Sequence, residues 1–173
     1  MLEFEMIKNE TIELTNKSGF PCTQEEINNM DILDFGLKNP RQEGAQILTL
    51  SQTDRLAVKL IALLPHQTLP EHWHVSVDGY QAKQEILRVV YGKLYIFFEK
   101  TDDETGLPVI LPEESRQYYT CNAGREMNPA EQILINPPTP HWFSAGDDGC
   151  VVLCISTTAF DYKDLFTNPN VIR

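Results

Sequence analysis

The stretch Glu85-Ile86-Leu87-Arg88-Val89-Val90-Tyr91-Gly92-Lys93-Leu94-Tyr95-Ile96-Phe97-Phe98-Glu99 decides the fold class of this chain. Apolar and β-branched residues dominate on both sides of Gly92, as is typical of strands in a packed sheet. A glycine inside such a run favours a tight turn. We therefore expect two strands, residues 85–91 and 93–99, joined by a turn at Tyr91-Gly92-Lys93.

The chain after residue 40 repeats this pattern of short apolar runs separated by turn residues. Further strands are predicted at residues 45–50, 55–64, 117–121, 132–135, 141–145 and 150–157. Residues 100–116 are acidic and contain proline, so we interpret them as a surface excursion. Many short strands with almost no helix predict an antiparallel sandwich or barrel.

The first 40 residues differ from the rest. Thr23-Gln24-Glu25-Glu26 is a capping box, and the apolar residues that follow it have rough helical spacing. We expect a short helix over residues 24–35 that ends near Gly36. The prediction is one domain, in which a short N-terminal helical segment, residues 1–40, packs on a β-barrel, residues 41–173.

Composition narrows the function classes. The 173 residues, 42% of them hydrophobic, are enough for one domain with a real core. Against 25 acidic residues there are 14 basic ones, a formal charge of −11 that repels nucleic acid and anionic membrane surfaces. The sequence has no signal-peptide pattern, and its four cysteines lack the CxxC spacing. We expect a cytoplasmic protein with reduced thiols that binds neither nucleic acid nor a membrane.

The candidate functional residues are mainly histidines. His72 and His74 are two apart, so on a strand both imidazoles face the same side. Glu85 begins an apolar strand and needs a partner if it is buried. His141 follows a proline-rich turn, whereas His66 is interpreted as structural or exposed. Three imidazoles and a carboxylate would bind a first-row divalent ion (manganese, iron, cobalt, nickel or zinc) and leave one or two positions open.

The order His72-x-His74, Glu85-x6-Gly92 and then His141 resembles the two motifs of the cupin superfamily. Within it, the sequence is similar to the small manganese-dependent D-lyxose isomerases over roughly residues 23–170. The similarity includes Pro70-Glu71-His72-Trp73-His74, Lys83-Gln84-Glu85, Pro137-x-Thr139-x-His141-Trp142-Phe143 and Asp164-Leu165-Phe166-Thr167-Asn168-Pro169. The resemblance implies a mainly β, antiparallel jelly-roll barrel that binds manganese through His72, His74, Glu85 and His141. It further implies a homodimer that interconverts D-lyxose and D-xylulose.

Such an isomerase moves a proton between C1 and C2 of the open-chain sugar through a cis-enediolate. On this reading Glu85 binds the metal and shuttles the proton, and Lys83, two residues earlier on the same strand face, reaches the developing oxyanion. Phe143 is expected to line the cavity. Tyr95 and Tyr119 are candidate hydroxyl donors to the sugar.

One feature leaves alternatives open. The resemblance places an acidic residue near Cys154, and a general base is worth about 10²–10⁴ in rate. Without that acid, the same ligand set could instead serve an oxygen-using cupin (a dioxygenase or decarboxylase), or a binding protein without catalysis. Asp161 and Asp164 are interpreted as capping or turning the C-terminal segment.

Overall fold

The structure is a computed structural model that describes residues 2–77, 79–102, 106–157 and 160–173. Its elements are the helices α1 (Leu2–Ser18) and α2 (Gln24–Asn28), the 3₁₀ turns η1 (Arg116–Tyr118) and η2 (Asp161–Lys163), and the strands β1 (Asp31–Leu33), β2 (Ala45–Gln52), β3 (Leu56–Leu63), β4 (Thr68–Trp73), β5 (Glu85–Glu99), β6 (Ala123–Met127), β7 (Gln132–Ile135), β8 (His141–Thr157) and β9 (Leu165–Phe166).

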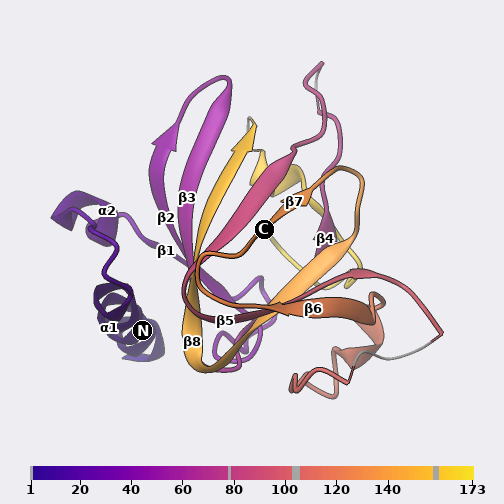
Figure 1. Cartoon of the computed structure of the whole chain (residues 1–173), viewed down its shortest axis with the longest axis horizontal. Helices are drawn as coiled ribbons and strands as arrows, with labels where there is room; N and C mark the ends of the chain where they lie inside the picture. The colour runs from indigo at the N-terminus through magenta and orange to yellow at the C-terminus, as the bar shows by residue number, and fades with distance from the viewer. Residues whose placement is uncertain (1, 78, 103–105, 158–159) are drawn as a thin grey trace.

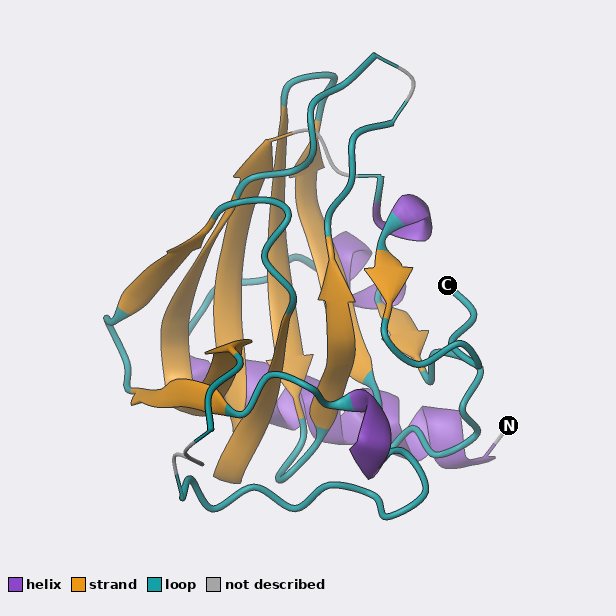
Figure 2. Cartoon of the chain, turned by 90° about the vertical axis from the view of Figure 1, so that its right-hand side faces the viewer, coloured by secondary structure: helices purple, strands orange, loops and turns teal. Residues whose placement is uncertain are grey.

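All strand pairs are antiparallel, and two long strands organise them. One path runs β1-β2-β3-β8-β4-β9, while β5 pairs with β6, β7 and β8. The second half of β8 pairs with β3 and its first half with β4, so β8 belongs to two parts of a sheet that curls on itself (Figures 1 and 2). The predicted antiparallel barrel is confirmed.

The expected hairpin over residues 85–99 is wrong, because β5 runs through Gly92 as one strand. Gly92 has a φ of +72°, and the register with β8 shifts on both sides of it. A Cβ at Gly92 would lie 2.0 Å from the carbonyl oxygen of Gly149 in β8. Glycine is therefore required here for a bulge and a close backbone approach, which bend the strand without reversing it.

Three other predicted boundaries need correction. The helix expected over residues 24–35 ends at Asn28, and Ile32 and Leu33 belong to β1, which pairs with β2. The strand expected at 117–121 is the turn η1 and the chain after it. The strands expected at 141–145 and 150–157 are one strand, β8.

The 17-residue helix α1 has no counterpart among the predicted elements, and it covers one outer face of the sheet. Ile7 and Leu14 of α1 pack against outward residues of the strands, Leu48, Leu60 and Val151. The residues that alternate with these face inward and form the barrel core, among them Ile47, Ile61 and Val152. No helix among the described residues is long and apolar enough to cross a membrane.

A second outer face is covered by a loop rather than a helix. Phe97 of β5 stacks on Trp142 of β8, with ring centroids 3.9 Å apart. Leu107, Val109 and Leu111 pack against this cluster. The described part of the predicted surface excursion, residues 100–116, is thus partly a cover for the sheet.

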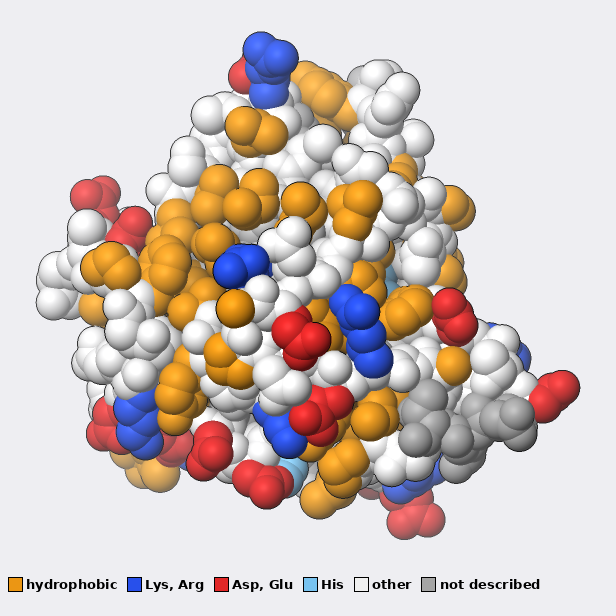
Figure 3. All heavy atoms as spheres, viewed as in Figure 1, with side chains coloured by type: hydrophobic (Ala, Val, Ile, Leu, Met, Phe, Trp, Pro, Cys, Tyr) orange, Lys and Arg blue, Asp and Glu red, His pale blue; other side chains and the backbone are white. Residues whose placement is uncertain are grey.

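On the face seen in Figure 3, acidic and basic side chains are interspersed, and hydrophobic side chains gather toward the α2–β2 side. This face shows no continuous basic patch of the kind that binds nucleic acid.

Candidate metal centre

Neighbouring strands bring three buried histidines together. His72 of β4 is in register with His141 of β8, and His74 lies just beyond the end of β4. The ring centroids are 4.3 Å apart for His72 and His141, and 5.1 Å apart for His74 and His141. One nitrogen from each ring lies within 4.8 Å of the others. The three imidazoles could therefore bind one ion.

The outer nitrogen of each ring is already engaged. Nδ1 of His72 is 2.9 Å from the carbonyl oxygen of Pro70, and Nδ1 of His141 is 2.9 Å from that of Thr139. Nδ1 of His74 is 3.0 Å from Oδ1 of Asp164. A carbonyl or carboxylate oxygen can only accept, so each Nδ1 carries the proton. The free lone pair then lies on Nε2, as in many metal-binding histidines.

Glu85, the first residue of β5, completes the cluster. Its Oε1 is 3.3 Å from Nε2 of His141 and 3.6 Å from Nε2 of His74. Both nitrogens are buried and make no hydrogen bond within the part of the chain that the structure describes. Two orphaned imidazole nitrogens facing a buried carboxylate are costly without a cation, and this donor set suits a first-row divalent ion.

The surroundings of His72 and Glu85 favour the protonation states that bind a metal ion, a neutral imidazole and a carboxylate. Burial, together with the neighbouring imidazoles of His141 and His74, holds the pKa of His72 well below its usual value, which keeps the ring neutral. Burial alone would raise the pKa of Glu85, but the charge of Lys83 and the contacts of His141 and His74 outweigh it and hold the pKa well below normal. Glu85 is thus a carboxylate.

Lys83 lies beside this carboxylate. Its Nζ is 3.5 Å from Oε2 of Glu85, 3.1 Å from Oδ1 of Asp161 and 3.5 Å from Oδ2 of Asp164. Burial would lower the pKa of Lys83, but these three carboxylates raise it well above its usual value. The structure therefore brings a charged ammonium next to the predicted ligand Glu85.

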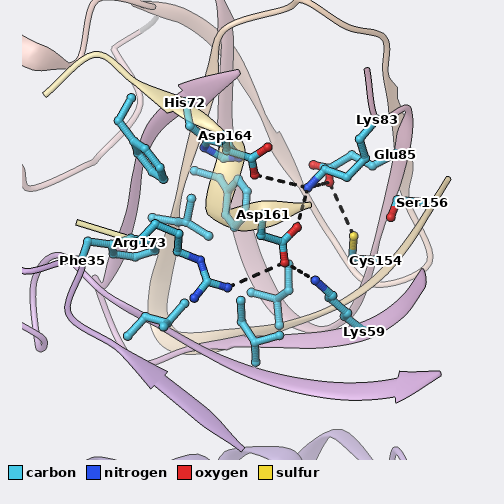
Figure 4. Close-up of a pocket in the computed structure, with 16 residues that line it drawn as sticks. Phe35, Lys59, His72, Lys83, Glu85, Cys154, Ser156, Asp161, Asp164 and Arg173 are labelled. Atoms are coloured by element: carbon cyan, nitrogen blue, oxygen red, sulfur yellow. Dashed lines mark hydrogen bonds and ion pairs between the residues drawn. The ribbon is translucent and has the colours of Figure 1, made fainter. Parts of the chain in front are cut away.

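Four charged residues beyond the predicted ones line the cavity: Lys59, Asp161, Asp164 and Arg173. Asp161 and Asp164 turn their side chains into the cavity, which differs from the capping role that the sequence indicates for them (Figure 4). Asp164 accepts a hydrogen bond from Nδ1 of His74. Asp161 pairs with Lys59 and Lys83 and lies 3.7 Å from Nη2 of Arg173.

The cavity has one apolar and one polar wall. Its lining comprises Leu33, Phe35, Ile47, Lys59, Ile61, Leu69, His72, Lys83, Glu85, Phe143, Cys154, Ser156, Asp161, Asp164, Phe166 and Arg173. Phe143 is one of these lining residues. Cys154 also lines it, with Sγ 3.6 Å from Oε2 of Glu85. Burial and the charge of Glu85 raise the pKa of Cys154, so the group at this position is a neutral thiol.

The two tyrosines expected to bind substrate lie elsewhere. Tyr95 belongs to the cluster around Trp142 on the outer side of the sheet. Tyr119 packs against the same tryptophan and donates a hydrogen bond to Oε1 of Glu43 at 2.8 Å. Neither residue lines the cavity described above. His66 is at the surface, 3.5 Å from Asp147.

Comparison with known proteins finds relatives that are similar in sequence over nearly the whole chain. No family model matches the chain. The D-lyxose/D-mannose isomerase of Thermosediminibacter oceani is 40% identical over 169 residues, which cover 96% of this chain and 92% of the relative. The D-lyxose ketol-isomerases of Cohnella laeviribosi and a Thermofilum species are 36% and 35% identical over 99% and 100% of this chain, and over 93% and 97% of their own lengths.

Solved structures show the same fold at lower identity. The L-ribose isomerase of Cellulomonas parahominis has a TM-score of 0.77 at 16% identity, with 98% of this chain and 93% of that chain covered. The L-ribose isomerase of Geodermatophilus obscurus has a TM-score of 0.73 at 17% identity, with 97% and 87% covered. These similarities concern the architecture of the barrel.

Proposed function

This chain belongs to the D-lyxose ketol-isomerase family, and from that premise we propose that it interconverts an aldose and a ketose, with D-lyxose and D-mannose as the first substrates to test. The observation that carries the proposal is the buried set of His72, His74, His141 and Glu85, with Lys83 against the same carboxylate. This set offers both a cation site and proton-carrying groups beside one cavity, which His72, Lys83 and Glu85 line.

The ligands of the proposed metal site are Nε2 of the three histidines and Oε1 of Glu85. An ion bound there supplies Lewis acidity that polarises a sugar carbonyl. We propose manganese(II) as the physiological ion on the strength of the sequence resemblance. Nitrogen and carboxylate ligands also accept iron, cobalt, nickel or zinc.

The two oxygens of Glu85 face different neighbours. Oε1 lies toward the imidazoles, whereas Oε2 lies toward Lys83 and Cys154. We assign to Glu85 the proton that leaves C2 and returns to C1 of the open-chain sugar. Lys83, held as an ammonium, donates to the oxygen that gains negative charge as the cis-enediolate forms.

The remaining walls serve the substrate without proton chemistry. Phe143 gives the cavity an apolar side against which the carbon skeleton of a sugar can lie. Cys154 is neutral and donates toward Glu85, so we assign it no proton transfer from carbon. Tyr95 and Tyr119 have no role in the proposal.

We also propose that the protein is a homodimer. One outward row of paired residues crosses four strands: Leu134, Ile86, Ile155 and Val58. Leu134 and Ile155 are 49% and 40% exposed, which is a high exposure for apolar side chains in one continuous row. Sedimentation should give twice the chain mass of 19.8 kDa, and Ile155→Glu should shift the protein toward the monomer.

The free state of all four cysteines supports a reducing, cytoplasmic location. Fractionation of the source cells would test it.

The decisive experiment measures ketose formation by manganese-loaded protein from D-lyxose and D-mannose. We expect turnover above ~1 s⁻¹, within the ordinary enzyme range. His141→Ala is the negative control, because it removes a ligand. A fully loaded protein that converts neither sugar would contradict the proposal, and oxygen uptake would then test the dioxygenase alternative.

A further inference from the structure

Asp161 is the only carboxylate that the structure describes in contact with three different cations of the cavity. It pairs with Lys59 of β3, its Oδ1 is 3.1 Å from Nζ of Lys83, and its Oδ2 is 3.7 Å from Nη2 of Arg173. These cations come from three distant parts of the chain. Figure 4 shows the Asp161 carboxylate between them, pointing into the cavity.

The three cations differ in how many carboxylates they contact. Lys83 also contacts Glu85 and Asp164, which face the histidines. For Lys59 and Arg173, Asp161 is the ion-pair partner among the described residues. The Lys59 side chain is only 9% exposed and that of Asp161 18%. Water therefore screens the Lys59–Asp161 pair poorly. The Asp161 carboxylate is the main negative charge that compensates Lys59 and Arg173.

The cavity without the Asp161 charge would have the character of an anion site. Lysine and arginine side chains converging on one buried point are what proteins use to bind phosphate groups. With Asp161 present, a phosphate entering this wall would meet a carboxylate whose charge repels it. A sugar hydroxyl carries no such penalty, because it can donate to the carboxylate and accept from the cations.

We propose that Asp161 is a specificity-determining residue, which makes this cavity accept an uncharged sugar and reject a phosphorylated one. The inference rests on the proposed function for the identity of the ligand as a sugar. It concerns the charge balance of the wall and not the reaction, so it can be tested by binding alone.

The test is calorimetric titration of inorganic phosphate into the manganese-loaded protein, comparing the wild type with Asp161→Asn. This change keeps the side-chain shape and removes the charge. We expect phosphate to bind the variant at least tenfold more tightly. Any phosphate that binds the metal itself contributes to both proteins and cancels in the comparison.

Two control variants make the result specific. Asp148→Asn removes one negative charge at an exposed position of β8, outside the cavity, and should leave phosphate affinity within twofold of wild type. Lys59→Met combined with Asp161→Asn removes one of the released cations, so its phosphate affinity should fall between those of wild type and Asp161→Asn. The double variant also avoids an unpaired buried lysine, which keeps the test available if Asp161→Asn folds poorly.

Equal phosphate affinity in wild type and in both Asp161→Asn proteins would overturn the inference. Failure of sugar isomerisation is a separate result, because it would appear in the turnover assay of the wild type. As a further arm, a hexose 6-phosphate should compete with D-mannose in Asp161→Asn and not in the wild type. Absence of this competition despite gained phosphate binding would contradict the assignment to sugar selection.

Discussion

Glu71 and Glu85 are two buried carboxylates on either side of the histidine pair, and the protein treats them in opposite ways. Glu71 is 2% exposed and accepts hydrogen bonds from the backbone N–H groups of Thr120 and Cys121 and from the hydroxyls of Thr120 and Thr167. Glu85 is 4% exposed, and its neighbours are imidazoles, an ammonium and a thiol.

This difference indicates a structural role for Glu71 and a chemical role for Glu85. Four neutral donors satisfy Glu71 completely, so this carboxylate joins the 120–121 loop and the segment after β9 to strand β4. Glu85 has no backbone donor in the described structure, and the imidazole nitrogens beside it are themselves unsatisfied. A buried carboxylate beside unsatisfied imidazole nitrogens is the condition that the proposed metal ion would relieve.

The largest effect is expected at the Glu85 side, from His141→Ala. Removing one of four ligands should reduce bound manganese from about one ion per chain to less than about a tenth, and isomerase turnover by about 10³-fold, or ~4 kcal/mol. Elemental analysis and ketose assays measure both. His66→Ala is the matched control, because His66 is a surface histidine. Full metal retention in His141→Ala would refute the ligand set.

Glu71→Ala should give the converse result. It leaves two backbone N–H groups and two hydroxyls without their acceptor, and we expect the free energy of unfolding to fall by about 3 kcal/mol. Urea denaturation followed by fluorescence measures this change. Metal content and turnover of the folded fraction should stay close to wild type. A variant that is stable but loses the metal would place Glu71 in the site and remove the contrast with Glu85.

Lys83→Ala sharpens the comparison within the Glu85 side. The change removes a proposed donor to the oxyanion and leaves all four metal ligands, so turnover should fall at least tenfold, about 1.4 kcal/mol, with manganese still bound. Lys163→Ala, an exposed lysine in η2, is the control. Unchanged kinetics in Lys83→Ala would exclude Lys83 from the mechanism.

The sequence predicts Glu85 and the three histidines better than the charged residues beside them, Lys59, Asp161 and Arg173. His72, Glu85 and His141 lie on strands, where alternation fixes the direction of each side chain, and His74 follows β4 directly, two residues after His72. Lys59 also occupies an inward position of an apolar strand, between Val58 and Leu60, and that pattern was a usable signal. Asp161 and Arg173 lie in irregular segments, where no period indicates direction.

The fold shows the same limit. Gly92 was interpreted as the turn of a hairpin because glycine marks turns and bulges alike, and only the approach of Gly149 from a distant strand distinguishes them. Helix α1 was missed because its polar sequence has a weak apolar stripe. Its stability comes from Ile7 and Leu14, which pack on the sheet, and such a tertiary contact cannot be read from local sequence.

The smallest expected effect is on the free energy of unfolding at acidic pH. It comes from Asp161, a third carboxylate, whose negative charge is balanced by lysine and arginine side chains. Burial opposes the charge of Asp161, but Lys83 and Lys59 outweigh burial and hold its pKa well below the ordinary 3.8. The folded protein therefore binds this proton less readily than the unfolded chain, so stability is present above pH 3.8 and is lost as the pH falls below it. When the pH falls from about 4 to 3, the free energy of unfolding should therefore drop by about 1 kcal/mol more in the wild type than in Asp161→Asn. Urea denaturation of both proteins at the two pH values measures the difference, since the other carboxyl groups titrate in both. Parallel losses in the two proteins would show that the cations do not hold Asp161 in its charged form, and the charge balance assigned to this wall would then be wrong.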